Sequence, residues 1–369
     1  MDGTMDWIIE QIKALLLDPL NPTFRLYWLY TLSAVVAAFL VFREARSKPA
    51  HPMSQDTDGS FLRFLFPERV WSHPSAWLDL RYVLLHKVIF RVVLVGTSFL
   101  GLSVGYSWVS GGRSIDDVVV QEGTVTIWDW GIAVGYMVFV FAIADLTAWT
   151  IHYLQHKVPI LWQFHKVHHS AEVMHPISNF REHPVDNFSY NFLIGISSGA
   201  AIGLASRSLG IIPQVPTIIG VSAVAFLFNF VAYNLRHSHI WLRWPGVWSS
   251  IFPSPAHHHV HHSRHSEHID KNFAFIFPMW DVIFGTYLMP DDNRDVEFGV
   301  TEGDDEGLDS VLGLYVVPFR DAYRVLTGRG KNKTHATQTR SDRQASQTCL
   351  LYTSPSPRDR QKSRMPSSA

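Results

Sequence analysis

The sequence predicts an all-α integral membrane protein with about four to five transmembrane helices and a cytoplasmic helical cap rich in histidine. Two observations support this fold class: apolar residues come in long runs, and 16 of the 20 histidines lie between His152 and His268. Hydrophobic residues make up 47% of the chain and charged residues 17%, whereas roughly 25% of an average soluble domain is charged. This composition excludes an intrinsically disordered chain. One cysteine excludes a disulfide scaffold, and a formal net charge of -1 excludes nucleic acid as the main partner.

Five apolar runs approach the length that spans a bilayer, which takes about 20 residues of helix. They cover residues 26–42, 88–109, 131–151, 188–205 and 217–235. Because Pro213 and Pro216 break the helix between the last two runs, we expect this pair to form a hairpin. Whether the hairpin crosses the membrane or re-enters it stays open at this point. A buried helix of a soluble core is the alternative for any one run, but it does not account for five of them.

The basic residues predict the orientation, because cytoplasmic loops carry an excess of Lys and Arg. The loop between the second and third runs holds one basic residue, Arg113, near Asp116 and Asp117. The segment between the first and second runs is basic, with Arg43, Arg46, Lys48, Arg63, Arg69, Arg81 and Lys87. We therefore expect the first loop to be cytoplasmic, together with the segments that follow the third and fifth runs.

The histidines form three clusters with helical spacing. The first cluster is His152 and His156, which at i and i+4 share one face of a helix. The second and third clusters both follow the pattern HxxHH, and they contain His165, His168, His169, His258, His261 and His262. Eight imidazoles at one membrane face would repel one another if protonated and leave lone pairs unsatisfied if neutral. We therefore predict that they bind metal.

The number of histidines favours two metal ions. Imidazole suits Fe, Zn, Cu and Ni, and a structural zinc site uses only four ligands. The main alternative is a metal transporter, or a histidine-rich membrane metal-binding protein without enzymatic activity. Transporters place ionisable residues near the bilayer midplane, whereas these clusters follow the predicted span ends. A membrane zinc protease needs HExxH, which the sequence does not contain.

The pattern HxxxH, HxxHH, HxxHH after a membrane helix resembles the fatty acid hydroxylase/sterol desaturase superfamily. The similarity covers about residues 144–290, including Asp145, Trp162 and Glu172 in the first block and the segment FREHP at 180–184. The second block of the family is resembled by three segments: NLRHSHI, SPAHHHVHHS and DKNFAFIFPMWDVIFGT. The residue pattern is most similar to that of the bacterial-type sterol desaturase branch. Two positions depart from the pattern, because Asn or Gly is common where His239 and Ala274 stand.

The resemblance implies a membrane-bound non-haem di-iron oxidoreductase that uses O2 to hydroxylate or desaturate a C–H bond of a lipid. The lipid would be a sterol, a fatty acyl chain, a sphingolipid or an ether lipid. Electrons would come from a separate NAD(P)H reductase or carrier protein. The resemblance implies as metal ligands His152, His156, His165, His168, His169, His237, His258, His261 and His262. It also makes Asp145 and Glu172 candidates for supporting the ligands, since each lies at helical spacing from a histidine.

The chain is expected to divide into five parts. Residues 1–25 form an amphipathic N-terminal segment, 26–130 the first two spans, 131–290 the catalytic domain, and 291–348 a partly disordered cytoplasmic region. A short amphipathic helix is expected within 311–326. Residues 349–369 resemble the translation of a sequencing-library adapter, so we expect them to be an artefact. The expected location is the endoplasmic reticulum if the source is eukaryotic, or the inner membrane if it is bacterial.

Overall fold

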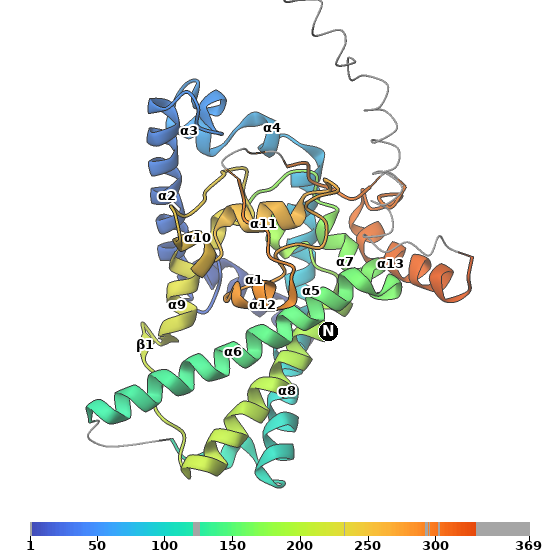
Figure 1. Ribbon diagram of the computed structural model, residues 1–369. Coiled ribbons are helices and arrows are strands. Elements are labelled where there is room, and N and C mark those ends of the chain that lie inside the picture. The colour runs from blue at the N-terminus through green and yellow to red at the C-terminus, as the bar shows by residue number, and fades with distance from the viewer. Residues whose placement is uncertain are drawn as a thin grey trace, which may run out of the picture.

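The structure is a computed structural model that describes residues 2–120, 126–231, 233–291, 294, 296–301 and 303–329. The expected artefact at 349–369 and most of the expected disordered region lie outside these residues. The fold is mostly helical (Figure 1). Its helices are α1 Asp2–Leu17, α2 Trp28–Ser47, α3 Phe61–Leu65, α4 Glu68–Trp71, α5 Pro74–Ser110, α6 Ile127–Lys157, α7 Pro159–His169, α8 Pro184–Leu209, α9 Ala223–Phe230, α10 Trp248–Ile251, α11 Pro255–His262, α12 Met279–Phe284 and α13 Val311–Leu326. Two strands, β1 Thr217–Ile218 and β2 Val221–Ser222, form an antiparallel pair.

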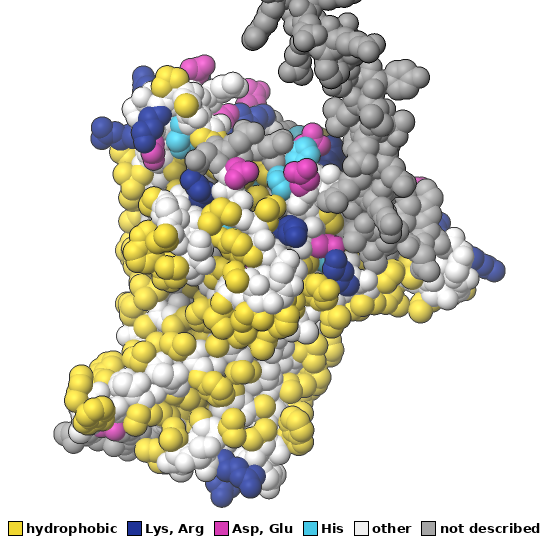
Figure 2. All heavy atoms as spheres, viewed as in Figure 1, with side chains coloured by type: hydrophobic (Ala, Val, Ile, Leu, Met, Phe, Trp, Pro, Cys, Tyr) yellow, Lys and Arg dark blue, Asp and Glu magenta, His cyan; other side chains and the backbone are white. Residues whose placement is uncertain are grey.

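Four of the helices, α2, α5, α6 and α8, are long and apolar enough to cross a membrane. They match the first four runs of the sequence, although α5 begins 14 residues before its run, at Pro74. Figure 2 shows apolar side chains over the lower half of the molecule, where Figure 1 places the far ends of α5, α6 and α8. Charged side chains and histidines gather at the upper end.

The fifth apolar run, residues 217–235, forms no single helix of membrane-spanning length among its described residues. In its place the chain forms the β1–β2 hairpin, the eight-residue helix α9 and a short 3-10 helix, Tyr233–Leu235. Ile219 and Gly220 at the hairpin tip have positive φ, 47° and 79°, which breaks the helix before it can reach spanning length. Eight helical residues rise only about 12 Å. The segment instead returns the chain from the far end of α8, where Ile212 bonds Val119, to the histidines.

Helices α5 and α8 pack backbone to backbone through glycine. A Cβ at Gly105 of α5 would lie 2.0 Å from the carbonyl oxygen of Ile196, and one at Gly199 of α8 would lie 2.0 Å from that of Leu102. Small residues permit such close approach between membrane helices. The two helices form a closely packed pair, and the N-terminal end of each helix reaches the histidine-rich part of the chain (Figure 1).

The histidine-rich part has its own apolar support. Helix α2 packs Ala38 and Phe42 into a core with Leu235, Ile240 and Val260, so it holds the segments on either side of the third cluster. Helix α13 covers α7 from the other side, and the buried Lys166 ammonium of α7 bonds the Asp321 carboxylate at 2.9 Å. The expected amphipathic helix within 311–326 is confirmed, with Pro318 inside it.

Candidate metal centre

The first cluster lies at the end of α6. His152 and His156 occupy successive turns, and both are buried. Helix α6 ends at Lys157 and Pro159 opens α7, where its fixed φ suits the first turn of a helix. The chain therefore turns sharply and brings the second cluster against the first.

Each HxxHH cluster divides between two groups of histidines. On α7, His165 and His169 turn toward the first cluster while His168 turns away from it. On α11, His258 and His262 turn toward His168, while His261 joins the first cluster. Three histidines at i, i+3 and i+4 would share one face of an isolated helix. In the folded chain they serve two neighbouring sites.

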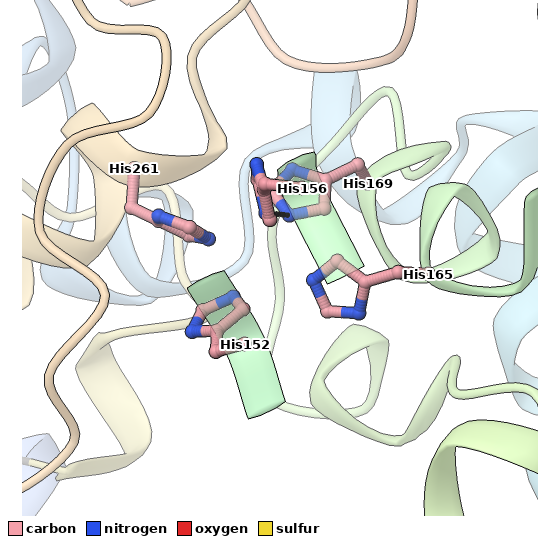
Figure 3. Close-up of side chains that lie close together, drawn as sticks. All are labelled: His152, His156, His165, His169 and His261. Atoms are coloured by element: carbon pink, nitrogen blue, oxygen red, sulfur yellow. Dashed lines mark hydrogen bonds between the residues drawn. The ribbon is translucent and has the colours of Figure 1, made fainter. Parts of the chain in front are cut away.

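The five-histidine group and the four-histidine group each bring one nitrogen per side chain together, all within 4.8 Å of one another. The first consists of His152, His156, His165, His169 and His261, whose rings converge in Figure 3. The second consists of His168, His237, His258 and His262. All nine are buried, and they are the nine that the family resemblance implies as metal ligands. Their role as ligands stays a prediction.

His237 joins the second group from outside any HxxHH cluster. It follows the short 3-10 helix Tyr233–Leu235. Its Nε2 lies 2.8 Å from Nε2 of His258, and its Nδ1 lies 3.0 Å from Oγ of Ser178. Nε2 of His262 lies a further 3.1 Å from that of His258.

Backbone carbonyls orient two of the rings. Nδ1 of His152 donates to the carbonyl of Phe273 at 3.0 Å, and Nδ1 of His261 donates to that of Lys271 at 2.8 Å. A carbonyl only accepts, so Nδ1 carries the hydrogen and Nε2 keeps its lone pair. Nε2 of His152 is buried and has no hydrogen-bond partner among the described residues. A cation held by the lone pair would satisfy that atom.

Two carboxylates reach ligand candidates that sequence spacing did not suggest. Oδ2 of Asp186 lies 3.3 Å from Nδ1 of His165, and Oδ1 of Asp270 lies 3.4 Å from Nδ1 of His156. Carboxylates in this position orient a ligating imidazole and raise its basicity. Asp186 comes 21 residues after His165 and Asp270 comes 114 after His156, so local periodicity gave no indication of either contact.

Asp145 and Asp281 support the centre through the backbone rather than by touching a histidine. Asp145 accepts hydrogen bonds from the amides of Ile276 and Phe277, at 3.0 and 2.9 Å. Asp281 accepts from the amide of Phe273 at 2.9 Å, and also from Ala274, Trp149 and Thr286. Both carboxylates therefore fix the segment whose Phe273 carbonyl holds His152.

Glu172 lies away from the histidine groups. Its carboxylate is 64% exposed, and it lies 3.6 Å from Nε2 of His73 at the start of α5. The turn that follows α7 directs the side chain outward, although helical spacing places it near His168. Its position does not support the predicted role.

Several other histidines are buried but serve the fold. His257 and His259, which flank His258, bond Ser254 and the Leu235 carbonyl. His183 caps α8 and donates to the Tyr315 carbonyl, and His239 donates to that of Phe64. Both His183 and His239 are buried.

Burial keeps the ligand candidates neutral. It lowers the pKa of His168 to about 4, and it holds the pKa values of His169, His237, His258 and His262 well below the usual range. A neutral imidazole has the lone pair that a metal needs. The nitrogen donors, their close approach and their neutrality fit two metal ions of the kind that imidazole binds.

The chain is also similar in sequence to known proteins. Residues 137–286 match the model of a family described as fatty acid hydroxylase. The chain is similar to alkylglycerol monooxygenase of Danio rerio, with 30% identity over 47% of this chain and 33% of the relative. It is also similar to ornithine lipid hydroxylase OlsE of Rhizobium tropici, with 26% identity over 43% of this chain and 44% of the relative. A third relative is sphinganine C4-monooxygenase 2 of Arabidopsis thaliana, with 27% identity over 41% of this chain and 54% of the relative. The chain thus spans about a third of the length of the alkylglycerol monooxygenases it matches. No solved structure matches it significantly.

Proposed function

We propose that the protein is a membrane-bound oxidoreductase, because residues 137–286 match the model of a family described as fatty acid hydroxylase. It uses O2 to hydroxylate or desaturate a C–H bond of a lipid. The observation that carries the proposal is the pair of buried histidine groups, five side chains in one and four in the other. Relatives whose names specify alkylglycerol, ornithine lipid and sphinganine support a lipid as the substrate.

The two groups would hold one iron ion each. His152, His156, His165, His169 and His261 would bind the first, and His168, His237, His258 and His262 the second. Bound iron supplies the redox chemistry that activates O2. The chain's own residues orient the rings: the Phe273 and Lys271 carbonyls hold the hydrogen on Nδ1, and Asp186 and Asp270 lie against two further imidazoles.

The placement of the centre suits a lipid substrate. His152 and His156 lie at one end of α6, a helix with the length and composition to cross a membrane. We further propose that this end faces the cytoplasm, because the basic residues of segment 43–87 lie between the first and second apolar runs, at the junction of α2 and α5. A separate reductase or carrier would deliver electrons there. The membrane would be the endoplasmic reticulum of a eukaryote or the inner membrane of a bacterium.

Metal content and isotope incorporation test the proposal together. The full chain, purified in detergent, should hold about two iron ions. With a reductant and ¹⁸O2, a screen of alkylglycerol, sphinganine and ornithine lipid should give a product that carries one labelled oxygen, or a desaturated product two mass units lighter. The same protein stripped of metal is the control.

Other outcomes would contradict the proposal. A single tightly held zinc would indicate a structural site, and reversible binding without fixed stoichiometry would indicate a metal-binding protein or transporter. Two irons with no lipid product in any lipid class would leave the metal centre in place and refute the oxygenase.

A further inference from the structure

Helix α13 carries a second apolar face, opposite to the one that packs on the rest of the molecule. Its packed side chains Leu314 and Val317 share a core with Val167 of α7. On the other face, apolar side chains recur after four, three, four and three residues, so they form one line along the helix. Each is more than half exposed, from 53% for Val316 to 72% for Leu312. This outer stripe consists of Leu312, Val316, Phe319, Tyr323 and Leu326.

The outer stripe lies close to the point where the surface of α5 becomes apolar. The core that α13 shares with α7 also contains Leu78 and Tyr82 of α5. From Leu84 and Leu85, within one turn of Tyr82, α5 exposes apolar side chains along a helix that is apolar enough to cross a membrane. Helix α13 is therefore attached at the boundary where α5 enters the hydrocarbon of a bilayer.

Aromatic contacts show that the outer stripe is turned toward this boundary. Tyr315 lies on the flank of α13 beside the stripe, and its ring centroid is 4.9 Å from that of Tyr82 and 6.0 Å from that of Phe90. Phe90 follows Tyr82 by about 12 Å of helix, in the direction of the apolar part of α5. The Phe319 ring of the stripe lies 5.1 Å from the ring of His183, which caps the start of α8. The stripe thus lies beside the ends of two helices that are able to cross a membrane.

The flank of α13 between its two apolar faces is basic. Arg320 and Arg324 lie there, and both bond the Asp321 carboxylate, at 2.8 and 3.3 Å. Figure 2 shows apolar side chains along the lower edge of the projection that Figure 1 labels α13, and they continue toward the apolar lower half of the molecule. An apolar face beside a basic flank is typical of a helix that lies in the plane of a membrane surface.

We propose that the outer stripe of α13 binds the surface of the lipid bilayer, so that α13 lies in the membrane plane at the end of the molecule that holds the histidine groups. Its apolar side chains reach about 5–10 Å into the boundary between headgroups and acyl chains. Helix α13 also covers α7, where the Lys166 ammonium bonds the Asp321 carboxylate at 2.9 Å. The bilayer surface is thus placed one helix away from the histidines of α7, whether or not they hold iron.

A second copy of the chain is the alternative occupant of the stripe, because spacings of four and three residues are also those of a coiled-coil seam. Such a seam is usually sustained over about three or more heptads, whereas α13 has only 16 residues. Pro318 lies inside α13, where it removes a backbone hydrogen bond and bends the helix away from a straight partner. A fluid bilayer accommodates a bent helix, so these observations favour lipid.

Depth-dependent quenching of a fluorescent label tests the contact in the full chain without requiring turnover. The only cysteine is removed by Cys349→Ser, and bimane is attached at Val316→Cys in phosphatidylcholine nanodiscs that hold one chain each. A doxyl group near the lipid headgroup should remove roughly half of the fluorescence, and one near the end of the acyl chain should remove less. Iodide in the water should have little effect.

Two other positions calibrate the quenching. Val95→Cys labels α5 at a side chain that is 67% exposed. It lies about 16 Å beyond Leu84 along the helix, near the middle of a bilayer, so the deep doxyl group should quench this label more than the shallow one. Asp305→Cys, on an exposed loop, should be quenched by iodide and by neither doxyl lipid.

A matched pair of double variants tests the stripe itself, with bimane attached at Tyr323→Cys. Leu312→Glu and Val316→Glu together should reduce shallow quenching about twofold, because a carboxylate is costly to bury in hydrocarbon. Leu312→Met and Val316→Ile together keep the stripe apolar and should leave the quenching unchanged. Both side chains are exposed, so neither pair should disturb the packed core beneath α13.

Three results would overturn the inference. Iodide quenching of the label at Val316 that is as strong as at Asp305 would place the stripe in water. Shielding from both iodide and doxyl lipid in one-chain nanodiscs would mean that another part of the chain covers the stripe. Shielding that arises only when a nanodisc holds two chains would identify a second copy as the partner. None of these measurements depends on lipid oxidation, so the proposed function stands or fails separately.

Discussion

At the scale of the residue, the centre depends on which ring nitrogen each histidine presents. Residues 270–272 show how this is fixed. Asp270 and Asn272 both have left-handed backbone, with φ of 58° and 57°, which Asn and Asp tolerate better than most residues. This turn directs the Lys271 carbonyl to His261 and the Asp270 carboxylate to His156. The orientation of these ligand candidates is therefore set by residues outside the two histidine groups.

Removing one imidazole from each group should release metal from a chain that still folds. His261→Ala and His168→Ala each delete a buried nitrogen donor, and loss of a ligand from a metal site costs affinity directly. We expect each variant to lose at least half of the bound metal, measured by elemental analysis, and all lipid oxidation. The control is His268→Gln, which changes a histidine outside both groups. Full lipid oxidation in either alanine variant would contradict the ligand assignment.

Asp281→Asn should weaken the centre from outside it. The Asp281 carboxylate accepts hydrogen bonds from two backbone amides, the Trp149 indole and the Thr286 hydroxyl. The NH2 group of an asparagine in its place cannot accept, so it would face some of these donors and leave them without an acceptor. We expect the free energy of unfolding to fall by about 1–3 kcal/mol, which would be measured as a lower thermal unfolding temperature. We also expect weaker retention of metal. Asp305→Asn, on an exposed loop, serves as the control. Unchanged unfolding would show that the four contacts contribute little.

At the scale of the element, long helices and short ones do different work. Helices α5 and α8 approach closely enough that glycine is required where they touch. The short helices α7 and α11 carry six of the nine ligand candidates, and they are too short to be stable alone. Their positions come from packing against α6, α13 and the core beneath α2. The long helices α2, α5, α6 and α8 thus form a frame, and packing against this frame orients α7 and α11.

Two glycines of α5 offer a matched test of this frame. At Gly105 a Cβ would clash with the α8 backbone, whereas at Gly96 a Cβ meets nothing within 4 Å. Gly105→Ala should lower the unfolding temperature and the yield of folded protein, because backbone atoms cannot move aside as a side chain can. Gly96→Ala should be neutral or stabilising by up to about 1 kcal/mol. Equal behaviour of the two variants would mean that α5 and α8 are not held this closely.

At the scale of the whole molecule, the histidine-rich part is a buried polar assembly joined to an apolar helical frame. Burial lowers the pKa of His183 and His239 to about 4 and that of His257 and His259 to about 3. All four histidines form their hydrogen bonds as neutral rings. Burial also lowers the pKa values of the ligand candidates His168, His169, His237, His258 and His262. The stability of the folded chain is therefore tied to keeping these rings unprotonated.

This coupling predicts acid sensitivity. The unfolded histidines have pKa values near 6.5, so as pH falls below about 6.5 the unfolded chain takes up protons before the folded one does. The free energy of unfolding should then decrease steadily down to about pH 4 and be nearly constant above pH 7. Thermal unfolding of the metal-free chain between pH 5 and 8 measures this trend. His239→Gln keeps a donor for the Phe64 carbonyl and should make the slope shallower; a flat profile in the parent chain would contradict the argument.

The sequence by itself determined the four long helices and most of the histidines that the fold brings together. Apolar runs predicted the four long helices, and the HxxxH and HxxHH spacings selected eight of the nine histidines that the fold collects, because both depend on local periodicity. His237 was implied only by the family resemblance. Only the tertiary structure decided how those histidines divide into groups of five and four, since that requires α7 and α11 to meet. It also decided that Asp186 and Asp270 reach the rings, that Glu172 does not, and that residues 217–235 return as a hairpin and short helix. These outcomes depend on contacts between residues distant in sequence, which hydropathy and spacing do not encode.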